Sequence, residues 1–491
     1  MDFFLSLAKA SWPELNEMAE RDVGLIGLGV MGQSLALNLQ NHGYKVAVYN
    51  RTEQKSREFV EKHSATSAAY SINEFVQSLS HPRRIILMLT AGAAIDTAIQ
   101  NLSNLLSPGD ILMDGGNSFF QDTERRCNDL AKQRIGYLGA GVSGGAEGAL
   151  KGPCIMVGGP RDAYDQVSDM LRKIAAQVDG PCCEYLGPRG AGHYVKMVHN
   201  GIEYAIIQII AETYDLLTRA AKLTIKQTRD VFKEWNESEL NSFLMEITVD
   251  VLTKSDPDTH RPLVSLILDR AKQKGTGKWT SQNAFDLGIP TPTIDAAVSA
   301  RNLSALKEER VKASKALKQP KRIVSGAVPG NFAERLMGAV HASIIISYSQ
   351  GFHLMRAAST EYKYQLPFAD VARIWKGGCI IRSRLLDQIK NSFEKDIDLQ
   401  NLMIDPGIAQ VLNRFEKGWR DSVRSAKELG IPIPALNASL DYYDGYRSEK
   451  LPANVIQALR DHFGAHTYER TDKPGDFHTN WSTQQNATAI S

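Results

Sequence analysis

Residues 23–32 read VGLIGLGVMG, a short apolar run followed at once by a glycine-rich turn, and residues 34–41 continue with helical periodicity. The turn has the GxGxxG spacing. In a strand–turn–helix unit these glycines allow a tight turn, close approach of backbone N–H groups to a pyrophosphate, and close helix–strand packing. The helix then points the positive end of its dipole at the phosphates. The motif alone also occurs in purely structural turns, but this context predicts a dinucleotide site. Its residues are Gly27, Leu28, Gly29, Val30, Met31 and Gly32.

Strand-like and helix-like segments alternate as far as about residue 190. Residues 45–49, 85–89 and 111–113 are apolar runs, each followed by helical periodicity. This alternation is typical of βαβ units in a parallel sheet. Beyond it, two amphipathic stretches at 191–221 and 332–358 exceed the mean helix length of about 11–12 residues. The sequence predicts an α/β, Rossmann-like dinucleotide-binding domain at the N-terminus, then a large all-α domain and a C-terminal tail.

The predicted boundaries divide the chain into four parts. They are an N-terminal arm (1–21), the Rossmann-like domain (22–190), the all-helical domain (191–446) and the tail (447–491). The arm precedes any strand signal and its role is not readable from the sequence. The tail is polar, is marked by Gly and Pro, and has too little periodicity to fold alone.

Composition excludes several classes of protein. The 491 residues carry 57 Lys and Arg against 55 Asp and Glu, a net charge of +2, which argues against a chain that coats nucleic acid or an anionic membrane. Apolar residues make up 43%, too many for a disordered chain. No apolar run approaches the ~20 residues of a membrane-spanning helix, and the N-terminus does not resemble a signal peptide. Five cysteines without a CxxC pair or ligand cluster predict no metal site and a reducing, cytoplasmic location.

The end of the second predicted strand discriminates between dinucleotides. An NAD enzyme usually has Asp or Glu there to bind the ribose 2′-hydroxyl. Here the sequence is Tyr49, Asn50, Arg51 and Thr52, with no carboxylate before Glu53. An arginine can pair with a 2′-phosphate, so we expect NADP as the cofactor. The alternative is that Arg51 is a solvated turn residue.

Four polar residues fall on one face of the first long helix. Lys196, His199, Asn200 and Glu203 have the spacing of neighbours on a helix of 3.6 residues per turn. Apolar residues lie between them, so we expect the flanking faces to be buried. Buried polar groups are costly unless they are paired, and burial shifts the pKa of Lys and Glu towards values useful for proton transfer. The alternative is a solvated face with a salt bridge along it.

Glycine-rich loops add further polar groups. DGGNS at 114–118 follows a predicted strand, and GVSGG at 141–145 lies further on. Either could be a structural loop, or could present amides to a ligand at the carboxyl edge of the sheet. GTGKWT at 275–280 lacks the GxxxxGK[ST] spacing of a triphosphate-binding loop.

Together these motifs resemble the decarboxylating 6-phosphogluconate dehydrogenases, from about Asp22 to Trp481. Beside the glycine turn, Asn50-Arg51-Thr52 and the two loops, the shared motifs are KMVHNGIEY at 196–204, GTGKWT at 275–280, RNLS at 301–304, IWKGGCIIRS at 374–383 and RDHFGAHTY at 460–468. The resemblance implies oxidation and decarboxylation of 6-phospho-D-gluconate to D-ribulose 5-phosphate and carbon dioxide with reduction of NADP, a step of the pentose phosphate pathway and of gluconate utilisation.

The resemblance also implies residue roles. Lys196 would be the general base on the C3 hydroxyl, and Glu203 the acid that protonates the enediol. A β-keto acid can lose carbon dioxide without a metal, because its own carbonyl group accepts the electron pair of the broken bond. The resemblance therefore implies no metal. Cofactor contacts would come from the glycine turn, Asn50, Arg51, Thr52, Leu89, Thr90, Ala91 and Asn117. Substrate contacts would come from Asn117, Ser143, Gly144, Gly145, His199, Asn200, Tyr204, Lys278, Thr280, Arg301, Arg460 and His466.

In the family the C-terminal segment reaches the neighbouring subunit, so the resemblance implies a homodimer in which Arg460 and His466 complete the partner's site. The chain departs from the family pattern at Thr90, where a lysine is frequent, and at Ala146 and Leu150 after the second loop. These departures put cofactor affinity and loop packing in doubt. Two alternatives stay open, a non-decarboxylating 3-hydroxyacid dehydrogenase and a catalytically silent NADP-binding protein.

Overall fold

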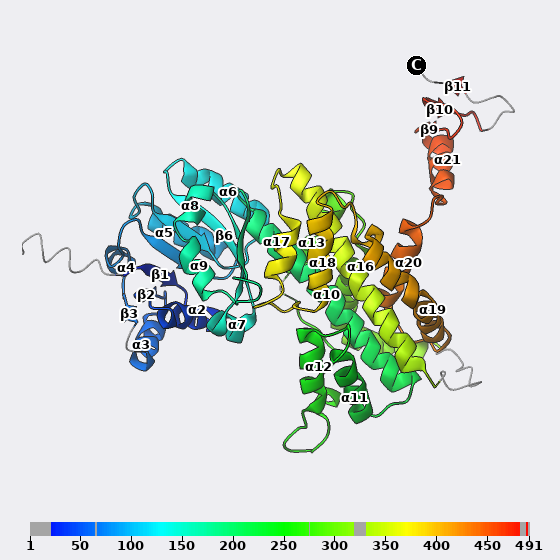
Figure 1. The fold of residues 1–491 in the computed structure, drawn as a ribbon, viewed down its shortest axis with the longest axis horizontal. Helices are drawn as coiled ribbons and strands as arrows, with labels where there is room; N and C mark the ends of the chain where they lie inside the picture. The colour runs from blue at the N-terminus through cyan, green and yellow to red at the C-terminus, as the bar shows by residue number, and fades with distance from the viewer. Residues whose placement is uncertain (1–20, 64–65, 274, 319–329, 482–487, 490–491) are drawn as a thin grey trace, which may run out of the picture. The chain divides into compact units, whose positions relative to one another are not determined.

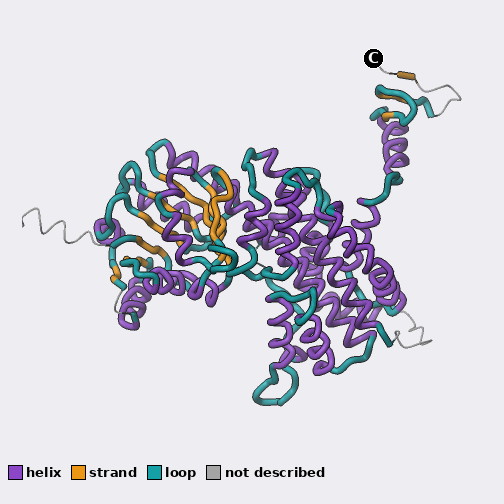
Figure 2. The backbone as a smooth tube through the Cα atoms, viewed as in Figure 1, coloured by secondary structure: helices purple, strands orange, loops and turns teal. Residues whose placement is uncertain are grey.

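The computed structural model describes residues 21–63, 66–273, 275–318, 330–481 and 488–489. The chain separates into two compact units, 1–439 and 440–491. In the first unit the strands are gathered in one part and the other part is built of helices (Figures 1 and 2). Most of the predicted arm lies outside the described residues, while Arg21 forms a bridge to Leu79. None of the described helices is both long and apolar enough to cross a membrane.

The first unit contains one eight-stranded sheet, in the order β3-β2-β1-β4-β5-β6-β7-β8. Its first six positions follow the strand order of a Rossmann fold, 3-2-1-4-5-6. The strands are β1 (Val23–Ile26), β2 (Val46–Tyr49), β3 (Ser67–Ala68), β4 (Arg84–Leu87), β5 (Ile111–Asp114), β6 (Gly136–Ser143), β7 (Cys154–Gly158) and β8 (Cys183–Gly187).

The expectation of a purely parallel sheet is wrong at one pair. Strands β1 to β6 are parallel, but β7 pairs antiparallel with β6, and β8 is parallel to β7. The reason is the connection between β6 and β7, which spans residues 144–153 and holds only the short helix α7 (Gly145–Lys151). A parallel crossover needs a dozen or more residues, so this shorter connection reverses the chain.

Alternation of apolar side chains builds a core on each face of the sheet. Leu25 and Ile86 belong to one cluster of buried side chains, while Ile26 and Ile85 belong to the other. Successive residues of a strand point to opposite faces, and because both faces are covered the strands are apolar throughout. The covering helices are α2 (Val30–Asn41), α3 (Glu53–Lys62), α4 (Ile72–Gln77), α5 (Ala93–Ser103), α6 (Phe120–Ala131), α8 (Arg161–Asp165) and α9 (Ser168–Ile174).

The helical part begins with α10 (Ala191–Asp215), which continues into a π-helical turn at Leu216–Ala220. The two long helices expected from the sequence are therefore present, the second as α16 (Phe332–Glu361). The other helices are α11 (Ile225–Asn236), α12 (Phe243–Thr253), α13 (Thr276–Asp286), α14 (Pro292–Ala305), α15 (Lys307–Ala316), α17 (Phe368–Ile374), α18 (Leu385–Lys395), α19 (Pro406–Glu428) and α20 (Pro434–Tyr446).

Helix α10 connects the sheet to the helical part, because it packs against β6, β7 and β8 and also against α13, α14 and α16. The contact with the sheet depends on Gly192. A Cβ atom on this residue would lie 2.4 Å from the carbonyl oxygen of Met156 and 2.5 Å from that of Gly139. The backbone of the helix therefore touches the backbone of the strands directly, and this fixes where the next two turns of α10 lie.

The second unit contains the last part of α20, which crosses the boundary between the units, α21 (Ala453–Gly464) and the short strands β9 (Tyr468–Glu469), β10 (Asp476–His478) and β11 (Thr488–Ala489). Its fold is centred on the buried carboxylate of Asp461, which accepts hydrogen bonds from His478 and from the indole N–H of Trp481. Burial opposes ionisation of Asp461, but these hydrogen bonds outweigh it and lower its pKa to about 2. The tail thus has more regular structure than its sequence suggested.

We expect Gly192→Ala to lower the free energy of unfolding by about 1–3 kcal/mol, because the added methyl group overpacks a backbone–backbone contact. Chemical denaturation followed by circular dichroism measures this change. Gly148→Ala in α7 is the matched control, since its nearest non-local atoms would lie 3.8 Å from the new Cβ. Equal stabilities of the two variants would contradict the close contact described for α10.

Candidate active site

The glycine turn joins β1 to α2, and its three glycines differ in what surrounds them. A Cβ on Gly27, whose φ is +103°, would lie 2.5 Å from the carbonyl oxygen of Met88. One on Gly32 would lie 1.9 Å from the carbonyl oxygen of Gly27, whereas one on Gly29 would meet no atom within 4 Å. The outer glycines are therefore required by packing, and the middle glycine keeps the surface of the turn open.

The end of β2 is fastened to this turn by Asn50. Its Oδ1 accepts a hydrogen bond of 3.0 Å from the N–H of Leu28, and its Nδ2 donates to the carbonyl of Thr52 at 3.0 Å. Arg51 and Thr52 are exposed. The side chain of Asn50 thus holds the exposed Arg51 beside the glycine turn. This position agrees with the sequence-based expectation that Arg51 follows the second strand.

Two further loops meet the turn at the carboxyl edge of the sheet. The N–H of Met88 donates to the carbonyl of Ile26 at 2.8 Å. A Cβ on Gly116 would lie 2.5 Å from the carbonyl oxygen of Leu89. The segment holding Leu89, Thr90 and Ala91 therefore lies between the glycine turn and the loop that follows β5. These are three of the segments in which cofactor contacts were predicted.

Asn117 lies in the loop after β5 and has a positive φ of 54°. Its carboxamide makes two hydrogen bonds to the backbone of Val142, accepting from the N–H at 3.1 Å and donating to the carbonyl at 3.3 Å. Val142 directly precedes Ser143 at the end of β6. Asn117 therefore joins the cofactor-side loop to the strand end that reaches the polar face of α10.

Lys196 is buried, with 5% of its surface exposed. Its Nζ donates to Ser143 Oγ at 3.1 Å and to Asn200 Oδ1 at 2.8 Å, and lies 3.4 Å from His199 Nδ1. Burial lowers the pKa of Lys196, and the nearby Glu203 carboxylate opposes that change. Because both hydrogen-bonding oxygens are uncharged, the environment favours the neutral amine more than water does.

Glu203 lies about two turns beyond Lys196 on the same face of α10. Its Oε2 is 3.9 Å from His199 Nδ1, and its side chain is 20% exposed. Burial raises the pKa of Glu203, while Lys196 and Arg301 act in the opposite direction. The carboxyl group therefore retains its proton to higher pH than an exposed glutamate. It remains accessible through the exposed part of its side chain.

His199 separates the lysine from the carboxyl group. Its side chain has no exposed surface, and it packs edge-on against Trp375 with ring centroids 5.5 Å apart. Burial lowers the pKa of His199 well below its usual value, and Lys196, when protonated, acts in the same direction. The imidazole is therefore neutral at physiological pH. The alternative of a solvated polar face is excluded for Lys196 and His199, which are buried, while Glu203 is partly exposed.

The two glycines after Ser143 differ in their surroundings. Gly144 has a φ of +111°, and a Cβ there would lie 2.7 Å from the carbonyl oxygen of Gly378. Gly145 also has a positive φ, but a Cβ on it would meet nothing within 4 Å. As in the first turn, one glycine serves packing and the next leaves an open surface beside Ser143.

Four of the predicted substrate residues follow Glu203 in the first unit, namely Tyr204, Lys278, Thr280 and Arg301. The guanidinium of Arg301 stacks on the ring of Tyr204, 3.5 Å from its centroid, and the Lys278 side chain is exposed. The hydroxyl of Thr280 donates to the carbonyl of Met197 at 2.8 Å. Thr280 thus fastens α13 to α10, and Arg301 of α14 is held against Tyr204 of α10.

Arg460 and His466 belong to the second unit, where both side chains are exposed. Arg460 donates to Gln457 Oε1 at 3.0 Å on the same helix. His466 follows Ala465, whose φ of 50° ends α21 in a left-handed conformation. The roles that the family resemblance implies for these two residues stay predictions.

Sequence reasoning missed two residues that shape the site. A Cβ on Gly141 would lie 2.4 Å from the Cβ of Lys196, so this strand glycine makes room for the lysine. The hydroxyl of Thr276 accepts from Asn200 Nδ2 at 2.9 Å and orients the amide that faces Lys196. A glycine inside an apolar strand is itself a signal, because it often marks the close approach of another backbone or a ligand.

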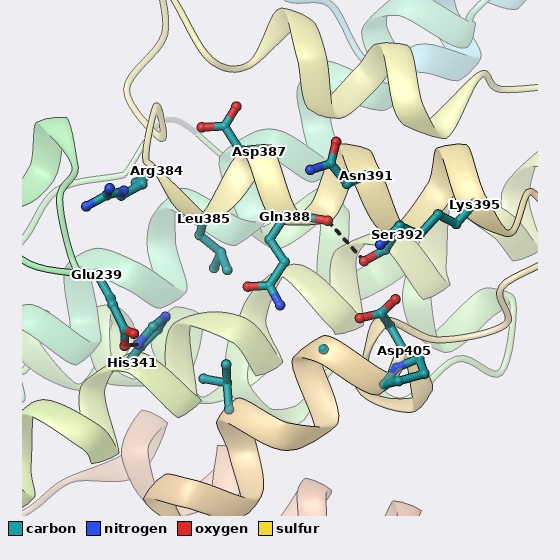
Figure 3. A pocket seen from close by; sticks show the side chains of 13 residues that line it. Glu239, His341, Arg384, Leu385, Asp387, Gln388, Asn391, Ser392, Lys395 and Asp405 are labelled. Carbon is teal, nitrogen blue, oxygen red and sulfur yellow. Dashed lines mark hydrogen bonds and ion pairs between the residues drawn. The ribbon is translucent and has the colours of Figure 1, made fainter.

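A cavity of about 530 Å³ lies elsewhere, in the helical part (Figure 3). It is formed by α18, the start of α19, His341 of α16, and Glu239 from the segment between α11 and α12. It contains none of the predicted site residues. Volume alone therefore does not identify the site. Among the residues that the structure describes, no group of three or more His, Cys, Asp or Glu side chains is arranged to hold a metal ion.

An open glycine turn on a Rossmann sheet, beside a helix with a buried lysine and carboxyl group, defines the class of dinucleotide-dependent dehydrogenases. Residues 22–187 match the family model for the NAD binding domain of 6-phosphogluconate dehydrogenase, and residues 192–481 match that for its C-terminal domain. The chain belongs to the 6-phosphogluconate dehydrogenase family. The family and the fold predicted from the sequence are both confirmed.

Individual relatives cover almost the whole chain. A Bacillus subtilis protein named 6-phosphogluconate dehydrogenase, NADP(+)-dependent, decarboxylating is 50% identical over 467 residues, 94% of this chain and 100% of that protein. The Escherichia coli K12 protein named 6-phosphogluconate dehydrogenase, decarboxylating is 48% identical, with the same coverage. The solved structure of Plasmodium falciparum 6-phosphogluconate dehydrogenase has a TM-score of 0.91 and 42% identity, covering 94% of this chain and 100% of that one.

We expect Gly29→Ala to weaken cofactor binding and Gly32→Ala to lower stability. Gly29→Ala leaves the melting temperature unchanged, because its Cβ meets no protein atom, but it weakens NADP binding about tenfold or more by blocking backbone approach to the pyrophosphate. Gly32→Ala lowers the free energy of unfolding by about 3 kcal/mol through overpacking. Calorimetry measures both quantities. Unchanged NADP affinity in Gly29→Ala would contradict the assignment of the turn.

Proposed function

We propose that this chain converts 6-phospho-D-gluconate to D-ribulose 5-phosphate and carbon dioxide, with reduction of NADP to NADPH. The observation that carries the proposal is the buried Lys196 amine, hydrogen-bonded to Ser143 and Asn200 beside the cofactor-side loops. It occurs in a chain that is 50% identical, over 94% of its length, to a relative named for this activity.

The residues at the carboxyl edge of the sheet fit NADP. Helix α2 has no acidic residue in its first turn and no side-chain cap, so its N-terminal N–H groups and dipole are available to a pyrophosphate. The exposed Arg51 beside the turn supplies a fork of donors for a 2′-phosphate. When bound, NADP accepts a hydride from the substrate.

Lys196 acts as the general base. The neutral amine removes the proton from the C3 hydroxyl as hydride leaves C3, and the product of this step is a 3-keto acid. Protonated Lys196 then gives its proton to the C3 carbonyl oxygen while the C1 carboxylate leaves as carbon dioxide, and the electron pair of the broken C1–C2 bond forms the C2–C3 double bond of an enediol. The lowered pKa of Lys196 supports the first of these roles, because a base must be unprotonated before it reacts.

Glu203 supplies the second proton. The enediol must be protonated at the carbon that becomes C1 of ribulose 5-phosphate, and the raised pKa of Glu203 keeps its acid form available. As that proton is delivered, the hydroxyl on the adjacent carbon returns its proton to Lys196 and becomes the carbonyl group of the product. The neutral His199 lies between the two groups and orients them. The different environments of a lysine and a carboxyl group on one helix face thus separate the acid role from the base role.

The remaining predicted contacts form two groups, according to the part of the substrate that each group would bind. Asn117, Ser143, Gly144, Gly145, His199 and Asn200 would surround the carboxylate and hydroxyl groups of the substrate, and Tyr204, Lys278, Thr280, Arg301 and Arg460 would surround its phosphate, while His466 would join Arg460 in completing the partner's site. Stacking of Arg301 on Tyr204 holds the guanidinium in one plane, which suits bidentate binding of a phosphate.

The direct test of the function is a coupled measurement of NADPH and carbon dioxide from purified protein and 6-phosphogluconate, with NAD in parallel. The proposal requires both products and a preference for NADP. A non-decarboxylating 3-hydroxyacid dehydrogenase would release no carbon dioxide, and a silent NADP-binding protein would form neither product. Either result would contradict the proposal.

We expect Lys196→Met to lower kcat at least about 1,000-fold, the upper part of the range for general acid–base catalysis, because a thioether cannot accept the C3 proton. NADP binding, measured by titration calorimetry, stays within about twofold of wild type. The control is Met197→Leu, a change at the adjacent buried residue of α10 that preserves apolar packing and leaves the amine in place. Turnover near the wild-type rate in Lys196→Met would refute the role of the base.

We also propose a homodimer in which the second unit of one subunit completes the site of the other. Helix α21 supports this, because Val455, Ile456, Leu459 and Phe463 are between 56% and 74% exposed. Contiguous exposed apolar side chains mark surfaces that bind another protein. The proposed occupant of this apolar face is a second copy of the chain.

The five cysteines, all buried free thiols, support a reducing, cytoplasmic location.

We expect subunit mixing to restore activity. Lys196→Met and Arg460→Ala are each inactive alone, but a heterodimer of the two has one site with both wild-type residues. Co-expression with two tags and tandem purification yields heterodimers with about half of the wild-type kcat per dimer. Lys196→Met paired with Glu203→Gln is the control, because both residues come from one subunit and neither site is repaired. No recovery in the first pairing would contradict the exchange of tails.

A further inference from the structure

His193 lies on α10, one turn before Lys196, and is 1% exposed. Its Nε2 is 3.0 Å from the carbonyl oxygen of Asp114, and its Nδ1 is 2.7 Å from Thr123 Oγ1. Asp114 is the last residue of β5 and Thr123 lies in the first turn of α6. One imidazole ring therefore contacts both ends of the connection that carries Asn117.

The two contacts define the protonation of the ring. A carbonyl oxygen only accepts hydrogen bonds, so Nε2 carries the proton and donates to Asp114. Nδ1 is then the acceptor for the Thr123 hydroxyl. Burial lowers the pKa of His193, which maintains this neutral form. A neutral imidazole offers one donor and one acceptor, and the structure uses both.

The surrounding backbone makes room for this arrangement. A Cβ on Gly139 of β6 would lie 2.6 Å from Thr123 Cγ2 and 3.0 Å from His193 Nδ1. Two residues further along the same strand, Gly141 makes room for Lys196 in the same way. Two successive turns of α10 therefore pack closely against β6. The first turn carries His193, which contacts the loop, and the second carries Lys196, the proposed base.

A chain of contacts connects the loop that carries Asn117 to Lys196. The carboxamide of Asn117 binds the backbone of Val142, and the adjacent Ser143 accepts from Lys196. The loop is thus attached to the base through β6 on one side and to α10 through His193 on the other. Other contacts hold the start of the loop to the sheet, since the Asp114 carboxylate accepts hydrogen bonds from Ser118 and Tyr137, but His193 connects both ends of the loop to α10.

We propose that His193 is a positioning residue, whose imidazole fixes the connection from Asp114 to Thr123 against α10 and so holds Asn117 at a set distance from Lys196. The inference rests on the proposed function, because the distance matters for hydride transfer between a substrate near Lys196 and a cofactor near Asn117. Misplacement of a reacting group by about 1 Å can cost about 100-fold in rate.

The test compares His193→Leu with His193→Gln, two variants of similar size. Leucine loses both hydrogen bonds, whereas the glutamine amide retains a donor for Asp114. The readouts are kcat, KM and the primary deuterium isotope effect with substrate deuterated at C3. His193→Leu is expected to lower kcat about 10- to 100-fold and to raise the isotope effect, with KM nearly unchanged. His193→Gln is expected to recover most of kcat.

Thr123→Val and Thr213→Val separate positioning from stability. Both residues are buried, and the Thr213 hydroxyl donates only within α10, to the carbonyl of Ile209. Thr123→Val is expected to lower kcat several-fold and to raise the isotope effect, while Thr213→Val changes neither. If His193→Leu does not fold, Thr123→Val and His193→Gln decide the question.

Three outcomes would overturn the inference. They are a wild-type isotope effect in His193→Leu, equal effects of Thr123→Val and Thr213→Val, and no recovery in His193→Gln. Wild-type protein that forms no NADPH from 6-phosphogluconate would overturn the proposed function and this inference together. An active wild type with an unaffected His193→Leu variant would overturn this inference alone.

Discussion

The burial of the Lys196 amine is the constraint on which the rest of the site depends. An ammonium group removed from water is costly unless a counterion or strong hydrogen bonds compensate. Its two hydrogen-bond acceptors, Ser143 Oγ and Asn200 Oδ1, are uncharged, and the carboxyl group of Glu203 lies beyond His199. The site therefore lowers the pKa of Lys196 and favours the neutral amine more than water does. Burial of Glu203 itself raises the pKa of that carboxyl group, so the same physical effect, acting on each side chain, prepares both the base and the acid.

Glycines place this helix face beside the cofactor-side loops. At Gly192, Gly139 and Gly141 a side chain would collide with the backbone of a strand, with His193 or with Lys196. These residues act through the volume that they leave free, which lets α10 contact β6 directly. The turn after β1 follows the same principle, since Gly32 serves packing and Gly29 leaves an open surface. Close packing of this kind transmits small displacements, so the site is sensitive to single methyl groups.

Local pattern predicted the elements but not the contacts between distant segments. The glycine turn, the helix beginning near residue 191 and the face shared by Lys196, His199, Asn200 and Glu203 follow from spacing alone, because helix and strand periodicities are local properties. The reversal of β7 depended on the length of one connection. The contacts of His193 and the packing role of Thr280 join residues 70 or more positions apart. No periodicity encodes such a pairing. Arg460 and His466 were predicted only through resemblance, and their contribution awaits the test of subunit exchange.

The most direct test of the central claim is the pKa of the Lys196 amine itself. NMR titration of protein labelled with carbon-13 at lysine Cε, with the Lys196→Met variant used to assign the resonance, measures it without reference to turnover. The account predicts one lysine that titrates clearly below the ordinary value of about 10.4. A Lys196 resonance that titrates at or above that value would contradict the account, because burial would then not lower the pKa of the proposed base.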